Sequence, residues 1–320
     1  MLSIEPIFII GAGLMGKGIA LDLALRGCHV MITDDDKEVL THASRHIAEL
    51  FHSLEELDYP FPEGVSDADP IERISIKDDC REAARADLVI EAISEDLEAK
   101  QRLYARLVPT LKPGAVLATN TSSLALEELR KGLRRPKILL GTHFFNPPPL
   151  MPLVETFAGE GGDPARLARV NDFLRSIGKE PVEVRRPLRG LIANRLQFAL
   201  LREAIALVEA GVAGPEDVDR VVRFSFGRRL AALGPFANAD LGGLHTYLRI
   251  FRYLLPAWGD GKEPELLTRL VANGHLGAAS GRGFLNWRQK NLEDLTRRRD
   301  GILADLLRRD QERPMEKECS

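Results

Sequence analysis

The chain has 320 residues, with 44 Lys or Arg and 47 Asp or Glu, for a formal net charge of −3. This length has room for two domains of roughly 150 residues, and the near balance of charge excludes a surface adapted to nucleic acid or anionic lipid. Hydrophobic residues at 44% and charged residues at 28% exclude a disordered or fibrous chain.

The first 186 residues alternate short β-rich runs with longer amphipathic runs. This alternation predicts βαβ units around a parallel sheet, so we expect a doubly wound α/β domain over residues 1–186. The expected strands are Ile7–Ile10, Val30–Thr33, Ile74–Ile76, Leu88–Ile90, Ala115–Thr119, Ile138–Thr142, Leu153–Phe157 and Pro181–Val184. The expected helices are Met15–Leu25, Lys37–Leu54, Leu97–Val108 and Pro164–Ser176, with Asp36 and Asp163 as N-caps.

The strand pattern stops after Arg186, and a second, all-helical domain is expected over residues 187–320. Its predicted helices are Ile192–Glu209, Glu216–Phe226, Leu241–Leu255 and Lys290–Arg309, followed by a polar tail over Asp310–Ser320. Several of these helices are apolar on more than one face. Because a large apolar helical surface is usually buried on something, we expect a homodimer.

Three cysteines, Cys28, Cys80 and Cys319, lie far apart without a CxxC pair, so neither a metal site nor a disulfide framework is expected. The first six residues have no basic region and contain Glu5 and Pro6, unlike a signal peptide. No apolar run reaches the ~18 residues of a membrane span. We therefore expect a cytoplasmic protein that does not bind membranes.

A glycine-rich turn joins the first strand to the first helix, with the sequence Gly11-Ala12-Gly13-Leu14-Met15-Gly16. Gly11 permits a tight turn, Gly13 lets the backbone approach a pyrophosphate, and Gly16 lets the helix pack closely on the strand. The helix N-terminus then offers free N–H groups to phosphate. We expect Gly11, Gly13, Leu14, Met15 and Gly16 to bind a dinucleotide in a Rossmann-type domain.

Asp34 follows the second strand, 18 positions after Gly16, where a carboxylate can accept hydrogen bonds from both ribose hydroxyls. It also repels a 2′-phosphate. Asp35 and Asp36 add negative charge and no Arg is close in sequence, so the predicted cofactor is NAD rather than NADP. The alternative is that the glycines form only a turn and Asp34 is an ordinary loop acid.

Four further segments have a recognisable pattern: Thr119–Ser123, His143–Pro147, Leu153–Glu155 and Ala193–Leu196. Together they resemble the L-3-hydroxyacyl-CoA dehydrogenase family, and the likeness extends from about residue 6 to Ser280–Phe284. The resemblance implies NAD-dependent interconversion of an L-3-hydroxyacyl-CoA and a 3-oxoacyl-CoA, as in the 3-hydroxybutyryl-CoA dehydrogenases of fatty acid metabolism.

The resemblance also assigns roles to single residues. His143 is the expected base, because an imidazole titrates near working pH, and Glu155 is expected to orient its ring. Ser122 and Asn194 are expected to hydrogen-bond the substrate oxygen or the imidazole. The alternative makes His143 a structural strand-end histidine and Glu155 a surface acid.

Glu95 and Lys100 match positions that contact the cofactor in relatives, and they follow the fourth expected strand, where such contacts are expected. Their alternative role is an ordinary solvated acid–base pair at the start of a helix.

The segment between the second and third strands departs from the family pattern. In hydroxyacyl-CoA enzymes basic and hydroxyl groups there help to hold CoA, whereas residues 49–72 contain eight acids and no Lys or Arg. These acids are Glu49, Glu55, Glu56, Asp58, Glu63, Asp67, Asp69 and Glu72. Because like charges repel, CoA binding through this arm is in doubt.

Three arginines precede the helix of Asn194 where relatives usually have Pro-Gly-Phe, namely Arg185, Arg186 and Arg189. One of them facing the site would clamp a free carboxylate; the alternative is a solvated interdomain edge. The helix beyond Trp287 is also longer than in the short acyl-CoA enzymes. Two further functions therefore stay open: a dehydrogenase of a CoA-free hydroxy acid or alcohol, and a non-catalytic NAD-binding protein.

Overall fold

The computed structural model describes residues 4–57, 59–60, 70–258 and 262–312. Its contacts divide the chain into two compact units, Met1–Ala199 and Leu200–Ser320. This division falls later than the boundary expected after residue 186. The reason is that the backbone amides of Ile192 and Ala193, at the start of the helix over Ala193–Glu209, donate hydrogen bonds to Glu155 in the sheet.

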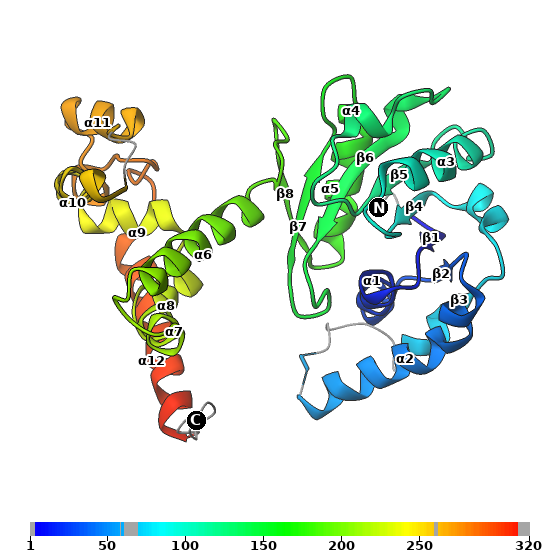
Figure 1. The fold of residues 1–320 in the computed structure, drawn as a ribbon, viewed down its shortest axis with the longest axis horizontal. Helices are drawn as coiled ribbons and strands as arrows, with labels where there is room; N and C mark the ends of the chain where they lie inside the picture. Colours follow the sequence, from blue (N-terminus) through cyan, green and yellow to red (C-terminus); the bar gives the residue numbers. More distant parts are fainter. Residues whose placement is uncertain (1–3, 58, 61–69, 259–261, 313–320) are drawn as a thin grey trace. The chain divides into compact units, whose positions relative to one another are not determined.

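The first unit contains an eight-stranded sheet in the order β3-β2-β1-β4-β5-β6-β7-β8 (Figure 1). All neighbouring strands are parallel except β6 and β7. The strands are β1 (Ile7–Ile10), β2 (Val30–Thr33), β3 (Ile74–Ile76), β4 (Leu88–Glu91), β5 (Val116–Thr119), β6 (Leu139–Phe144), β7 (Leu153–Phe157) and β8 (Glu180–Glu183). The predicted doubly wound α/β fold is confirmed, and β1 to β6 have the Rossmann strand order.

Helices cover both faces of this sheet, which explains why its central strands are continuously apolar. Helices α1 (Leu14–Leu25), α2 (Lys37–Glu56) and α5 (Pro164–Ser176) contribute to the core on one face. Helices α3 (Leu97–Leu107) and α4 (Leu126–Leu129) contribute to the core on the other. Asp36 and Asp163 cap α2 and α5 as predicted, each accepting hydrogen bonds from two backbone amides.

The second unit is helical, as predicted, and most of α6 belongs to it. Its helices are α6 (Ala193–Glu209), α7 (Pro215–Phe224), α8 (Phe226–Ala232), α9 (Pro235–Gly242), α10 (Leu244–Trp258), α11 (Glu265–Ala272) and α12 (Leu292–Glu312). The expectation of one helix over Leu241–Leu255 is wrong, because Gly243 has a φ of 83° and separates α9 from α10. Helix α12 continues past Arg309 into the expected polar tail.

None of the helices within the described residues is both long and apolar enough to cross a membrane. Cys319 lies outside the described residues, as does most of the expected tail.

Candidate active site

The glycine-rich turn places α1 directly against the end of β1. Gly11 has a φ of 104°, and a Cβ there would lie 2.6 Å from the Ala92 carbonyl oxygen. A Cβ on Gly16 would lie 1.7 Å from the Gly11 carbonyl oxygen. By contrast, a Cβ on Gly13 would meet nothing within 4 Å. Gly11 and Gly16 are therefore required for packing, whereas Gly13 leaves open space at the N-terminus of α1, which suits a pyrophosphate.

Leu14 and Met15 form the first turn of α1; Leu14 is exposed and Met15 packs against the core. Asp34 lies just beyond β2, and its carboxylate is fixed by two backbone amides. Oδ2 accepts from Ala12 N at 2.6 Å and Oδ1 accepts from Asp36 N at 2.9 Å. Each oxygen retains a second lone pair that can accept a ribose hydroxyl.

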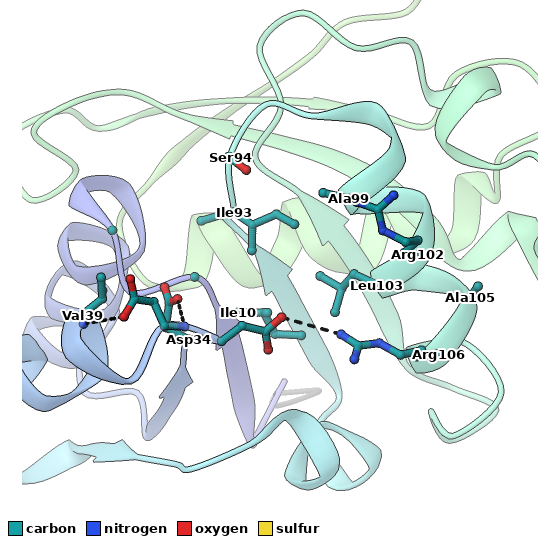
Figure 2. A pocket seen from close by; sticks show the side chains of 15 residues that line it. Ile10, Asp34, Val39, Ile93, Ser94, Ala99, Arg102, Leu103, Ala105 and Arg106 are labelled. Atoms are coloured by element: carbon teal, nitrogen blue, oxygen red, sulfur yellow. Dashed lines mark hydrogen bonds and ion pairs between the residues drawn. The ribbon is translucent and has the colours of Figure 1, made fainter.

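A cavity of about 910 Å³ opens between this turn and α3 and is large enough for part of a dinucleotide. Gly11, Gly13 and Asp34 line it from one side, and Arg102 and Arg106 line it from α3 (Figure 2). Sequence reasoning missed both arginines, because they lie far from Asp34 along the chain. Their i,i+4 spacing on a helix after the fourth strand was the available signal.

A buried ion pair lies at the end of β4. Glu91 is fully buried and Lys100 is 1% exposed; Lys100 Nζ donates to Glu91 Oε1 at 2.6 Å. Tyr104 and Thr119 donate their hydroxyls to the other oxygen of Glu91. Burial, followed by the Glu91 charge, raises the pKa of Tyr104 well above its ordinary value, so its hydroxyl stays protonated as a donor. Lys100 is thus enclosed rather than open to the cavity.

Glu95 connects this pair to the loop after β5. Its Oε2 lies 3.4 Å from Lys100 Nζ, and its Oε1 accepts from the Thr121 hydroxyl and from the Ser122 and Ser123 backbone amides. Burial alone would raise the pKa of Glu95, but these hydrogen bonds and the Lys100 charge lower it. An ionised Glu95 therefore fixes the loop that contains Ser122.

His143 and Glu155 face each other across the antiparallel strands β6 and β7. Directly opposed residues project from the same face of a sheet. The Nδ1 of His143 lies 2.9 Å from Glu155 Oε2, and His143 is 7% exposed. The Phe145 ring packs edge-on against the imidazole, with the centroids 4.5 Å apart. The ring is therefore held on two sides.

The second oxygen of Glu155 binds the chain at the start of α6. Oε1 accepts from Ile192 N at 2.9 Å and from Ala193 N at 3.0 Å. Burial alone would raise the pKa of Glu155, but the His143 hydrogen bond and these two amides lower it. One ionised carboxylate therefore orients the imidazole and fixes the first turn of α6, where Asn194 is half-buried.

Ser122 and Arg189 line a common small pocket. The pocket measures about 50 Å³ and also contacts Ser123 and Leu191. In the part of the chain that the structure describes, no hydrogen bond joins Ser122 to His143. Leu191 has a φ of 49°, an uncommon conformation for a non-glycine residue. This strained turn directs the chain from Arg189 into α6.

The acidic arm is only partly described. Asp58, Glu63, Asp67 and Asp69 lie outside the described residues. Two of the acids on α2 have basic neighbours: Glu49 pairs with Arg45 at 3.7 Å, and Glu55 pairs with His52 at 2.9 Å. Arg45 therefore offsets the charge of one of these acids, Glu49.

Two family models match the chain. Residues 6–187 match the 3-hydroxyacyl-CoA dehydrogenase NAD binding domain, and residues 190–287 match the C-terminal domain of 3-hydroxyacyl-CoA dehydrogenase.

Similar proteins include dehydrogenases that are named for CoA thioesters and one that is named for a substrate without CoA. The probable 3-hydroxybutyryl-CoA dehydrogenase of Bacillus subtilis is 35% identical over 90% of this chain and 99% of its own length. The 5-formyl-3-hydroxy-2-methylpyridine 4-carboxylate 5-dehydrogenase of Mesorhizobium japonicum is 33% identical over 88% of this chain and 90% of its own. The crystal structure of a 3-hydroxyacyl-CoA dehydrogenase from Archaeoglobus fulgidus superposes with a TM-score of 0.76 at 31% identity, covering 94% of this chain and 98% of the other.

Proposed function

Since the chain belongs to the 3-hydroxyacyl-CoA dehydrogenase family of NAD-dependent oxidoreductases, we propose that it interconverts an L-3-hydroxyacyl-CoA and its 3-oxo form, with His143 as acid and base. The observation that supports this most directly is the hydrogen bond between His143 Nδ1 and Glu155. It gives the imidazole a defined tautomer near the carboxyl end of β6.

The tautomer follows from the protonation state of Glu155. A carboxylate whose pKa is lowered is ionised near neutral pH and only accepts hydrogen bonds, so His143 Nδ1 carries the hydrogen. Nε2 then has a free lone pair. In the oxidation direction it accepts the substrate hydroxyl proton, and the Glu155 charge stabilises the imidazolium that forms. In the reverse direction the same nitrogen returns the proton.

NAD supplies the hydride acceptor when it is bound. Gly13 leaves room for its phosphates, Gly11 and Gly16 let the turn pack closely, and Asp34 is placed to accept its ribose hydroxyls. We place Leu14 and Met15 beside this turn. Glu95 is a direct contact in this proposal, whereas the buried Lys100 acts through Glu95.

Ser122 and Asn194 are proposed to hydrogen-bond the substrate oxygen. The loop of Ser122 is fixed by Glu95, and the helix of Asn194 begins at the amides that Glu155 binds. Both side chains therefore belong to segments held by ionised carboxylates, which favours a preorganised site.

Replacement of His143 by Gln tests this function. A general base contributes about 10²–10⁴-fold to rate, so we expect kcat for acetoacetyl-CoA reduction by NADH to fall by that factor, while NADH binding persists. The exposed His245 on α10 provides the matched His→Gln control. Near-normal turnover of a folded His143→Gln protein would refute the assignment.

A CoA-free carboxylate substrate is the second candidate. Arg189 lies beside Ser122 in the small pocket, and a guanidinium there suits a carboxylate. One relative at 33% identity is named for a pyridine 4-carboxylate. A panel of acyl-CoA thioesters and free hydroxy acids separates the candidates. Activity on a free acid whose KM rises in Arg189→Ala favours the second, whereas saturation by an acyl-CoA with no dependence on Arg189 favours the first.

A homodimer is proposed from the surface of α6. None of its residues is buried, and six of its large apolar side chains are exposed: Leu196, Phe198, Leu200, Leu201, Ile205 and Leu207. A second copy of the chain would cover this apolar surface. Sedimentation of the protein and of Leu201→Glu tests it, with a dimer expected only for the unaltered chain. A cytoplasmic location stays a prediction.

A further inference from the structure

An ion pair spans the proposed cofactor cavity at its adenosine end. Arg106 on α3 places a guanidinium nitrogen 3.7 Å from Asp35 Oδ2, just beyond β2 (Figure 2). Both side chains are largely exposed, 63% for Arg106 and 88% for Asp35. An exposed pair of this kind contributes little to stability. Its effect is instead on the charge that a ligand in the cavity meets.

The three neighbouring aspartates differ in what they bind. Asp34 is fixed by the amides of Ala12 and Asp36. Asp36 caps α2 by accepting from the amides of Glu38 and Val39. Within the described residues, Asp35 is the one of these three aspartates that pairs with an arginine of α3.

The other cavity arginine, Arg102, serves as an internal comparison. It lies one helical turn before Arg106 and pairs with Glu98 on its own helix at 3.3 Å. Removal of Asp35 would therefore release Arg106 and leave the partner of Arg102 in place.

We propose that the Asp35–Arg106 pair sets the choice between NAD and NADP, with Arg106 a latent ligand for a 2′-phosphate that Asp35 neutralises. The inference rests on the proposed position of the adenosine ribose at Asp34. A 2′-phosphate adds about −1.5 to −2 charges at neutral pH. Asp34 and Asp35 repel it, and Asp35 also occupies the guanidinium that would bind it. An arginine near this ribose accommodates the phosphate of NADP in other Rossmann domains.

Calorimetry with adenosine 2′,5′-bisphosphate and adenosine 5′-monophosphate tests the pair without turnover. Four proteins are compared with the unaltered chain: Asp34→Ser, Asp34→Ser/Asp35→Ser, and this double variant with either Arg106→Ala or Arg102→Ala. The measured quantity is the affinity for the bisphosphate relative to the monophosphate. NADPH kcat/KM provides a second readout.

We expect the double variant to gain about ten- to a hundredfold in this ratio over Asp34→Ser, the range for a hydrogen-bonded charge pair. Arg106→Ala should abolish the gain, and Arg102→Ala should preserve most of it. The inference is overturned if the double variant shows no gain in this ratio. It is also overturned if Arg106→Ala and Arg102→Ala reduce the gain equally. If the double variant does not fold, Asp35→Asn alone should raise the ratio in an Arg106-dependent way, and no rise overturns the inference.

The proposed cofactor site has a separate control. Failure of the unaltered chain to bind adenosine 5′-monophosphate, combined with undiminished NADH binding by Asp34→Ser, would place the nucleotide elsewhere. That result would overturn the proposed site and the pair together. Normal monophosphate binding with an unchanged ratio overturns only the role of Asp35 and Arg106.

Discussion

Replacement of Glu155 by Gln changes the charge of one group while retaining its shape. Glu155 accepts three hydrogen bonds, from His143 Nδ1 at 2.9 Å, Ile192 N at 2.9 Å and Ala193 N at 3.0 Å. The Gln carbonyl oxygen can still accept the two backbone amides. Its NH₂ group then faces His143 and donates to Nδ1. The imidazole is forced into the opposite tautomer, with Nε2 protonated and unable to act as a base.

The size of the effect follows from this tautomer change. A neutral isostere of the orienting carboxylate in a serine protease triad lowers kcat about 10⁴-fold, and loss of a general base costs about 10²–10⁴-fold. We expect a fall of that order in kcat, equivalent to about 3–5 kcal/mol of transition-state stabilisation. The KM for NADH should change little, because the changed group contacts His143 and α6 rather than the nucleotide cavity.

The assay is NADH oxidation by acetoacetyl-CoA, with folding checked by circular dichroism and thermal unfolding. Glu155→Ala serves as the comparison, because it also leaves the amides of Ile192 and Ala193 without their acceptor. It should lose both activity and about 1–3 kcal/mol of stability. A folded Glu155→Gln protein with kcat within about threefold of the unaltered chain would refute the orienting role.

The remaining predictions concern stability and cofactor binding. Gly16→Ala should destabilise the fold by about 1–3 kcal/mol, because its Cβ would lie 1.7 Å from a backbone oxygen. Gly13→Ala should leave the melting temperature unchanged and weaken only NADH binding. Equal melting temperatures for the two variants would contradict this. Glu91→Gln should cost about 3 kcal/mol in denaturant unfolding, the lower end for breaking a buried pair, because Glu95 remains 3.4 Å from Lys100; a loss below about 1 kcal/mol would count against the pair. The folded pKa of Glu155 lies below its ordinary 4.5, so the stability that the ionised carboxylate gives the fold is present above about pH 4.5 and is lost as pH falls through the folded pKa. The unfolding free energies of the unaltered chain and Glu155→Gln should therefore converge in acid. A constant difference between them would contradict the shift.

The sheet and its nucleotide turn were predictable from the sequence. Continuous apolar runs such as Ile7–Ile10 have one stable place, a parallel strand covered on both faces. The glycine spacing acts locally where Gly16 meets the Gly11 carbonyl oxygen, and Asp36 acts locally by capping α2. In the helical unit the sequence was less informative, because apolar periodicity does not register a break such as Gly243 inside a continuous apolar pattern.

The geometry of the polar contacts depends on how the elements pack, including that of the expected pair of His143 and Glu155. His143 and Glu155 are 12 positions apart, and the β6–β7 register places them directly opposite each other. The binding of Glu155 to the start of α6, the enclosure of Lys100 by Glu91 and the approach of Arg106 to Asp35 connect separate elements of the chain. Such contacts depend on how packed elements align, and composition and spacing along one chain contain no measure of that alignment.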